Sequence, residues 1–216
     1  MPSPAEIVRA LAERTAFAAP PRGTGRYRYL RTSGWARHTA RTTDGRVLSA
    51  STRFFAREDW IAADGSGRLL VTQGEAVVRP SGYFPPGGLL GDFVDASDLA
   101  SATAALRRRV SPSRAGKAFS SVWLTQVVPP DLQRLLLRWL AEHPGLVVED
   151  ADLPGVVVSV PDAAWLRRRL LVFDSRTGML LETRDVEEGG ATVSGCTRWL
   201  EAGYTDSTES RPAEAS

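Results

Sequence analysis

The sequence predicts an α+β protein in which helices pack on the concave face of a curved antiparallel β-sheet. Strand patterns open and close the chain and helical patterns occupy its middle, an order typical of α+β domains. Short turn signals separate successive strands, and Asp131–Glu142 has an apolar helical period. A length of 216 residues, 43% of them hydrophobic, fits one main domain, which we place at residues 23–205.

Residues 1–22 are predicted to form an N-terminal helix and a loop. Within Ala5–Ala18 the apolar residues recur at helical spacing, so that they share one face. These residues are Ile7, Val8, Leu11 and Phe17. Ser3 is a suitable N-cap and Pro4 is tolerated in the first turn, whereas Pro20–Pro21 ends the helix.

The first half of the main domain is predicted to consist of antiparallel strands. In Arg26–Thr32 the alternation places Tyr27 and Tyr29 on one face of a strand. Turn signals at residues 44–45 and 64–67 predict two hairpins. The strands around these turns are expected at Ala36–Thr42, Arg46–Phe55, Trp60–Ala63 and Arg68–Thr72.

A loop and a helical insertion are predicted next. Gln73–Asp95 is rich in Gly and Pro, which predicts a long loop. The insertion covers about residues 95–143 and contains three predicted helices, Asp95–Arg109, Gly116–Val127 and Asp131–Glu142. The last helix carries an apolar stripe that we expect to face the sheet. Its members are Leu132, Leu135, Leu136, Trp139 and Leu140.

The last third of the domain returns to strand patterns, and a polar tail follows it. Five strands are expected, at Leu146–Glu149, Gly155–Val160, Ala164–Phe173, Met179–Asp185 and Thr192–Glu201. Residues 206–216 are polar and are predicted to be disordered.

The charged residues give little information about a partner. The chain has 27 Lys plus Arg, of which only Lys117 is a lysine, against 25 acidic residues, and its formal net charge is +2. Such an arginine excess is typical of a G+C-rich genome. The triplets Arg107–Arg109 and Arg167–Arg169 are interpreted as a helix end and as a solvated strand face. We expect no nucleic-acid partner.

Few residues are candidates for catalysis or metal binding. Cys196 is the only cysteine, so no intrachain disulfide can form, and a buried thiol in a strand behaves as a small hydrophobe. His38 is expected to face solvent, and His143 to contact the carbonyl groups at the end of the preceding helix. No glycine-rich segment has the spacing of a phosphate-binding loop. We therefore predict no catalytic residue, no metal site and no cofactor.

Aromatic residues indicate a single ligand site. The six tryptophans exceed what a core of this size needs, and a curved sheet that its helices cover incompletely leaves an apolar groove. The residues predicted to line this ligand groove are Tyr27, Tyr29, Trp60, Trp123, Trp139 and Trp165.

Several short strings occur in the same order in a bacterial family. They are GRYRYLRT at 25–32, WIAADGSGR at 60–68, FPPG at 84–87, Pro129-Pro130 before the Leu-rich helix, FDSRTG at 173–178 and GYTDS at 203–207. On these strings, over about residues 5–212, the chain resembles membrane-anchored proteins of high-G+C bacteria that are encoded beside RNA polymerase sigma factors. The outer domain of that family is similar to the lipoprotein-carrier (LolA-like) and anti-sigma regulator (RseB-like) superfamily. The resemblance thus implies a half-barrel that encloses helices.

The resemblance also bears on location. Members of the family usually carry a cytoplasmic segment and a transmembrane helix before the domain, and this sequence begins where the domain is expected to begin. No stretch approaches 18 apolar residues, so no membrane span is predicted. We expect the extracytoplasmic face of the membrane if the chain is an ectodomain, and the cytoplasm if Met1 is the true start.

Three functions follow as hypotheses. The main one is a non-catalytic sensory or binding domain that holds an apolar ligand or a partner segment in the half-barrel groove. The second, implied by the resemblance, is a protein–protein regulator in a sigma-factor pathway. The third is an enzyme whose site we do not recognise, for which Cys196 and His143 are the candidates.

Overall fold

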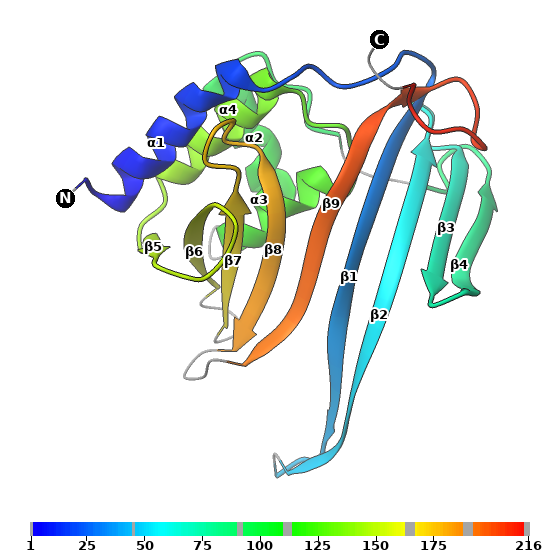
Figure 1. Ribbon diagram of the computed structural model, residues 1–216, viewed down its shortest axis with the longest axis horizontal. Helices are drawn as coiled ribbons and strands as arrows, with labels where there is room; N and C mark the ends of the chain where they lie inside the picture. The colour runs from blue at the N-terminus through cyan, green and yellow to red at the C-terminus, as the bar shows by residue number, and fades with distance from the viewer. Residues whose placement is uncertain are drawn as a thin grey trace.

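The protein folds around one open, antiparallel β-sheet. The computed structural model describes residues 2–44, 46–89, 93–109, 114–162, 167–187 and 192–213. Within these ranges nine strands follow the order β4-β3-β2-β1-β9-β8-β7-β6-β5. Their bounds are β1 Tyr27–Arg41, β2 Val47–Ile61, β3 Gly67–Gln73, β4 Ala76–Phe84, β5 Val147–Glu149, β6 Val156–Asp162, β7 Arg167–Phe173, β8 Leu180–Glu187 and β9 Val193–Thr205. The sheet is curved and is not closed into a barrel (Figure 1), which confirms the predicted fold class.

The helices lie on the concave side, beside one half of the sheet. They are α1 Pro4–Arg14, the 3₁₀ turn η1 Thr15–Phe17, α2 Leu99–Arg109, α3 Ala115–Trp123 and α4 Pro130–Ala141. In Figure 1 they gather beside β5–β9, whereas β1–β4 extend away from them. Helix α3 packs on β6 and β7, and α1 packs on α4. None of the helices in the described ranges is long and apolar enough to cross a membrane.

The sequence explains why the two amphipathic helices form where they do. Helix α1 begins at a capping box, in which the Ser3 hydroxyl accepts a hydrogen bond from the Glu6 amide and the Glu6 carboxylate accepts one from the Ser3 amide. Helix α4 begins with Pro130, whose ring suits the first helical turn. The predicted stripe of α4 is buried apart from the half-buried Leu135, and Leu137 is buried with it.

The main core lies between the helices and strands β6–β9. Phe119 of α3 meets Phe173 of β7 edge to face, with ring centroids 5.7 Å apart. The polar side chain of Gln133 is fully buried in this core. Gln133 accepts a hydrogen bond from the indole N–H of Trp123 at 3.1 Å and donates one to the carbonyl oxygen of Gly178 at 2.8 Å. The buried polar groups therefore have hydrogen-bond partners at the point where α4 meets the β7–β8 turn.

Strands β1 and β2 are each a single strand of fifteen residues, and the prediction of two short strands in each place is wrong. Gly34 interrupts the sequence pattern because it has no side chain, but it lies in the middle of β1. A Cβ at Gly34 would lie 2.1 Å from the carbonyl oxygen of Cys196 on β9. Glycine is thus present because the neighbouring backbone approaches closely, and the strand continues through it.

Strand β4 lies inside the segment Gln73–Asp95, which the sequence predicted to be a loop. Pro80 and Gly82 argue against a strand in the sequence, but β4 is an edge strand, where proline is tolerated. Its pairing with β3 is irregular between Leu69 and Val71. The hydroxyl of Ser81 accepts a hydrogen bond from the Val71 amide at 2.8 Å and so replaces a bond of the ladder.

Candidate binding surface

Three of the predicted groove residues lie on the sheet face that points away from the helices. Arg28 lines a cavity together with Leu132 of α4, so it faces the helices. Alternation along β1 then turns Tyr27 and Tyr29 to the opposite face. There Tyr29 lies across from Trp60, with ring centroids 5.3 Å apart. These three aromatic residues and Ala62 form a small buried cluster of their own.

Residues 206–213, which we call the C-terminal strap, pack against that aromatic cluster. The carbonyl oxygens of Ser210 and Thr208 accept hydrogen bonds from Trp60 Nε1 at 2.7 Å and from Arg68 Nη1 at 3.1 Å. Arg211 forms an ion pair with Glu58, with 3.0 Å between Nη2 and Oε1. The prediction of a disordered tail is thus wrong for this stretch, because polar groups of the strap find partners on the sheet.

The remaining groove residues lie elsewhere. Trp123 and Trp139 are buried in the main core between helices and sheet, where Trp123 meets Trp199 of β9 at 6.0 Å. Trp165 lies outside the described residues. The structure therefore places the described groove residues in two clusters, on opposite faces of the sheet, and does not bring them together as the lining of one groove.

A different set of residues lines a cavity of about 400 Å³ on the concave side. The guanidinium of Arg28 stacks on the Phe93 ring at 3.6 Å, and its buried Nη1 has no hydrogen-bond partner. Burial lowers the pKa of Arg28. The apolar part of the lining consists of Val94, Ala96, Val127, Pro129 and Leu132. The sequence analysis missed Arg28 because an arginine between two tyrosines in a strand is normally solvated.

The surroundings of the side chains considered for catalysis, Cys196, His143 and His38, do not form a catalytic arrangement in the described part of the chain. Cys196 is buried beside Glu182, and burial together with that carboxylate raises the pKa of its thiol to about 11. His143 contacts the Trp139 ring, with ring centroids 4.6 Å apart, and burial lowers its pKa. The predicted helix-end contact is present only through its backbone, whose N–H donates to Leu140. His38 is exposed, as expected. Among the described residues, no three His, Cys, Asp or Glu side chains are grouped to hold a metal ion.

The arginine triplets differ in their surroundings. Arg107 and Arg108 are exposed at the end of α2, as predicted. In the second triplet, Arg169 turns inward, where it bonds Asp185 and the Ser120 hydroxyl. Arg168 forms an ion pair with Glu149. The interpretation of Arg167–Arg169 as a solvated face is therefore wrong for these two, because each finds an acidic partner, Asp185 on the adjacent β8 and Glu149 on β5.

One side of β2 is unpaired over part of its length. Strand β2 pairs with β1 from Val47 to Ile61, but with β3 only from Ala56 to Ile61. Between Val47 and Phe55, no strand of the described chain lies on its other side. Figure 1 shows this part of β1 and β2 as a hairpin that projects beyond the helices. We call residues 47–55 the open edge of β2.

Apolar side chains are unusually exposed along the open edge. Leu48 and Phe54 are 62% and 66% exposed, and Val47 is 48% exposed. The hairpin sequence 36–55 contains four arginines, at 37, 41, 46 and 53, and Asp44 as its one acid. The edge therefore offers unpaired backbone groups, apolar side chains and positive charge in one place.

The open edge ends beside an apolar cavity. This cavity of about 290 Å³ lies between β2–β4 and the end of α3, and Ile61, Leu69, Phe84 and Leu124 are among its lining residues. Arg57 also lines it, but its guanidinium is bound at 2.7 Å to both carboxylate oxygens of the buried Asp59. Burial raises the pKa of Asp59, and the Arg57 ion pair limits that rise. The cavity wall is thus mainly apolar, and the charge of its one arginine is neutralised by Asp59.

Comparison with known proteins gives similarities to solved structures. No family model and no curated protein matches the chain. MucB in complex with MucA(peri) has 15% identity and a TM-score of 0.32, over 98% of this chain and 58% of that chain. The Pseudomonas aeruginosa MucA/MucB complex has 15% identity and a TM-score of 0.33, over 98% and 59%. MucB itself has 18% identity and a TM-score of 0.30, over 95% and 60%. The chain spans about three-fifths of the length of these structures.

Proposed function

We propose that this protein is a non-catalytic binding domain that takes up an extended segment of a partner polypeptide along the open edge of β2. The observation that carries the proposal is the run from Val47 to Phe55, which has a paired neighbour on one side only. The N–H and C=O groups of such an edge form hydrogen bonds with any strand that lies beside it. A polypeptide is the one class of ligand that satisfies them in series.

The side chains of the open edge indicate which residues the partner segment contains. Four arginines against one acid in residues 36–55 favour an acidic segment. The exposed Leu48 and Phe54 favour apolar residues at alternate positions, because alternate residues of an added strand share a face. The partner segment is therefore expected to alternate between apolar and acidic residues and to lack proline.

The biological setting that we propose is regulation in a sigma-factor pathway, on the extracytoplasmic face of the membrane. The resemblance of the strings at 25–32, 60–68 and 203–207 to membrane-anchored proteins encoded beside sigma factors supports this setting. In that setting, the partner is a protein encoded near this one.

The test uses a photo-cross-linking amino acid at the exposed Ser51, expressed in the native host. The cross-linked partner is identified by mass spectrometry, and hydrogen exchange of the purified complex is then measured. We expect slower exchange of the amides of residues 47–55. The double substitution Leu48→Glu and Phe54→Glu is expected to reduce cross-linking at least about tenfold, since it removes apolar contact and repels acidic residues.

Val77→Glu is the matched control for these substitutions. Val77 is 62% exposed on β4, outside the open edge, and the replacement is the same in kind. It is expected to leave cross-linking unchanged. Protection confined to residues other than 47–55, or equal cross-linking by the double variant, would contradict the proposal.

A second candidate function is supported by the cavity at Arg28. A buried guanidinium nitrogen without a partner, among Val94, Val127 and Leu132, suits a ligand with an anionic head and an apolar tail. Native mass spectrometry with oleate as the probe tests this function. We expect Arg28→Met to weaken oleate binding about tenfold, and Arg37→Met, at an exposed site on β1, to leave it unchanged. Equal binding by both variants would rule this site out.

A further inference from the structure

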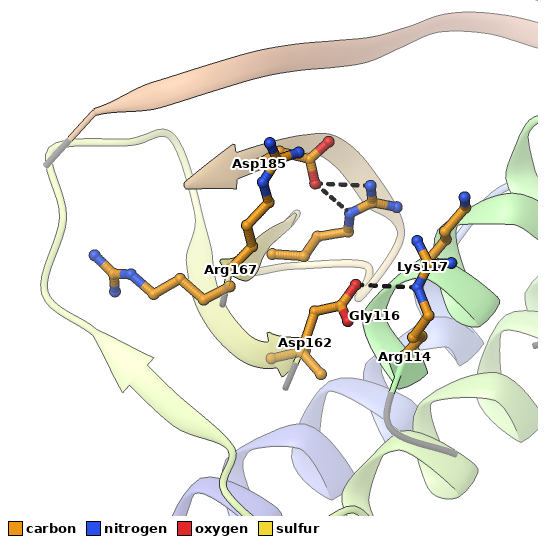
Figure 2. A pocket seen from close by; sticks show the side chains of 9 residues that line it. Arg114, Gly116, Lys117, Asp162, Arg167 and Asp185 are labelled. Atoms are coloured by element: carbon orange, nitrogen blue, oxygen red, sulfur yellow. Dashed lines mark hydrogen bonds and ion pairs between the residues drawn. The ribbon is translucent and has the colours of Figure 1, made fainter. Parts of the chain in front are cut away.

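A basic pocket lies at the junction of α3 with β6, β7 and β8, away from the open edge of β2. Its volume is about 260 Å³. Figure 2 shows the side chains that line it, which come from the first turn of α3 and from the neighbouring strands. Seven of its lining residues are charged, five of them basic and two acidic. They are Arg114, Lys117, Arg167, Arg168, Arg169, Asp162 and Asp185.

Both acids are held in place by arginines. Two guanidinium nitrogens of Arg169 contact Oδ1 of Asp185, at 2.8 and 2.7 Å. The third nitrogen donates a hydrogen bond to the Ser120 hydroxyl at 2.6 Å. Arg114 lies 3.2 Å from Asp162 Oδ2. The Arg114–Asp162 ion pair and the Arg169–Ser120 hydrogen bond hold α3 against the strands, and the two ion pairs neutralise two of the five cations.

The remaining cations leave the pocket with excess positive charge. Arg168 is paired with Glu149, which lies outside the pocket lining. Lys117 and Arg167 are exposed, and no carboxylate of the described chain lies within ion-pair distance of either. Two cations without an acidic partner among the described residues therefore line one small cavity, which suits an anionic phosphate group.

One atom of the pocket also lacks a donor. Oδ1 of Asp162 is buried and has no hydrogen-bond partner, although its other oxygen binds Arg114. A buried carboxylate oxygen without a donor is costly, on the order of 1 to 3 kcal/mol. A ligand that brought a hydroxyl group to this point would supply the missing hydrogen bond.

We propose that the basic pocket binds a glycerol phosphate group. Lys117 and Arg167 contact the phosphate oxygens, and Asp162 Oδ1 accepts a hydrogen bond from a hydroxyl of the glycerol. The same chemical group occurs in soluble glycerol 3-phosphate and in the headgroup of phosphatidylglycerol, so both sources enter the test.

The position of the single lysine gives the test a direct readout. Lys117 is the only lysine of the chain, so acetylation by an activated ester followed by peptide mass spectrometry reports on one side-chain amine. We expect glycerol 3-phosphate, or vesicles containing phosphatidylglycerol, to slow acetylation of Lys117. Sodium chloride at the same ionic strength and phosphatidylcholine vesicles are expected to have no such effect. Protection by one arm alone identifies the source.

Calorimetric titration with glycerol 3-phosphate, or with the phosphatidylglycerol vesicles where they alone protect Lys117, separates the two parts of the site. Lys117→Met and Arg167→Gln are each expected to weaken binding about tenfold. Arg108→Gln, at an exposed arginine near the end of α2, is the matched control and is expected to leave the binding of the phosphate ligand unchanged. If the soluble ligand binds, propyl phosphate, which lacks the hydroxyls, is expected to bind several-fold more weakly than glycerol 3-phosphate.

Each possible failure has a defined meaning. Acetylation that no glycerol phosphate source slows, or that sodium chloride slows equally, overturns the proposal. Unchanged binding by the Lys117 and Arg167 variants overturns it as well. Thermal unfolding of both variants is expected to match that of the wild type, because neither side chain has an acidic partner among the described residues. Weakened binding with unchanged unfolding therefore supports the site.

Discussion

The indole N–H of Trp60 donates a hydrogen bond to the backbone carbonyl of Ser210, with 2.7 Å between the two heavy atoms. This bond joins the convex side of β2 to the C-terminal strap. Tyr83 adds a second side-chain contact, since its hydroxyl lies 3.1 Å from a Glu209 carboxylate oxygen. The strap is therefore part of the folded domain, and it shields an aromatic cluster that would otherwise face water.

Deleting residues 206–216 is expected to destabilise the fold by about 2 kcal/mol, because the aromatic cluster becomes more exposed and Trp60 loses its hydrogen bond to the Ser210 carbonyl. Urea unfolding measures the loss, and a red shift of tryptophan emission reports the exposure of Trp60. In a Trp60→Phe background the deletion should cause little red shift. Unchanged stability after the deletion would show that the strap does not stabilise the sheet.

The ion pair between Glu58 and Arg211 gives the strap a pH dependence. Burial tends to raise the pKa of Glu58, but hydrogen bonds from Arg211 and Tyr29 outweigh it, so the pKa is lowered. A lowered carboxylate pKa stabilises the fold above the unfolded pKa, near 4.3, and this contribution is lost as pH falls through the folded pKa. Arg211→Gln should therefore be less stable than wild type at pH 7, and the difference should shrink below about pH 4.3. A difference that persisted in acid would contradict this origin.

Some elements could be predicted from the sequence because their apolar residues form a single face with a regular spacing. Helix α4 is recognisable because its apolar spacing matches the helical period. The sequence predicts two short strands in place of β1 and two in place of β2. The reason is that half of each strand projects beyond the core, so its residues do not alternate between apolar and polar. The strap could not be predicted, because its bonds use the backbone carbonyls of Thr208 and Ser210.

The site was harder to predict than the fold, for a geometric reason. Arg28 lies on the opposite sheet face from Tyr29 and Trp60, and composition does not say which face the helices cover. Likewise, the basic pocket combines Lys117 of α3 with Arg167 of β7, and these two meet only after the helix has packed on the sheet. The open edge of β2 could not be predicted either, because it exists only since β3 is shorter than β2.

Gln133 should be sensitive to substitution because its amide satisfies two buried groups at once. Gln133→Leu leaves Trp123 Nε1 and the Gly178 carbonyl without partners, and we expect a loss of about 2 to 4 kcal/mol. Chemical denaturation measures this loss. Gln73→Leu, at an exposed site on β3, is the control and should change stability by less than about 0.5 kcal/mol. A small effect at Gln133 would mean that water replaces the amide.

Cys196 is expected to react slowly with alkylating agents. A pKa of about 11 leaves about a hundredfold less thiolate at pH 8 than an ordinary cysteine has. Alkylation by iodoacetamide, followed by mass spectrometry, should be at least about a hundredfold slower in the folded protein than in urea. Equal rates in the two conditions would show that the thiol is accessible and activated, which would revive Cys196 as a candidate nucleophile.

The pairing of β1 with β9 brings Tyr27 beside Thr205, in the middle of the sheet. A ribosome releases β1 long before it releases β9, so the central seam of the sheet cannot form until nearly the whole domain has been synthesised. Contacts between such distant positions slow folding. During synthesis, β1 therefore exposes the edge that later pairs with β9, and a nascent chain with two open edges has a greater need of chaperones than the finished protein.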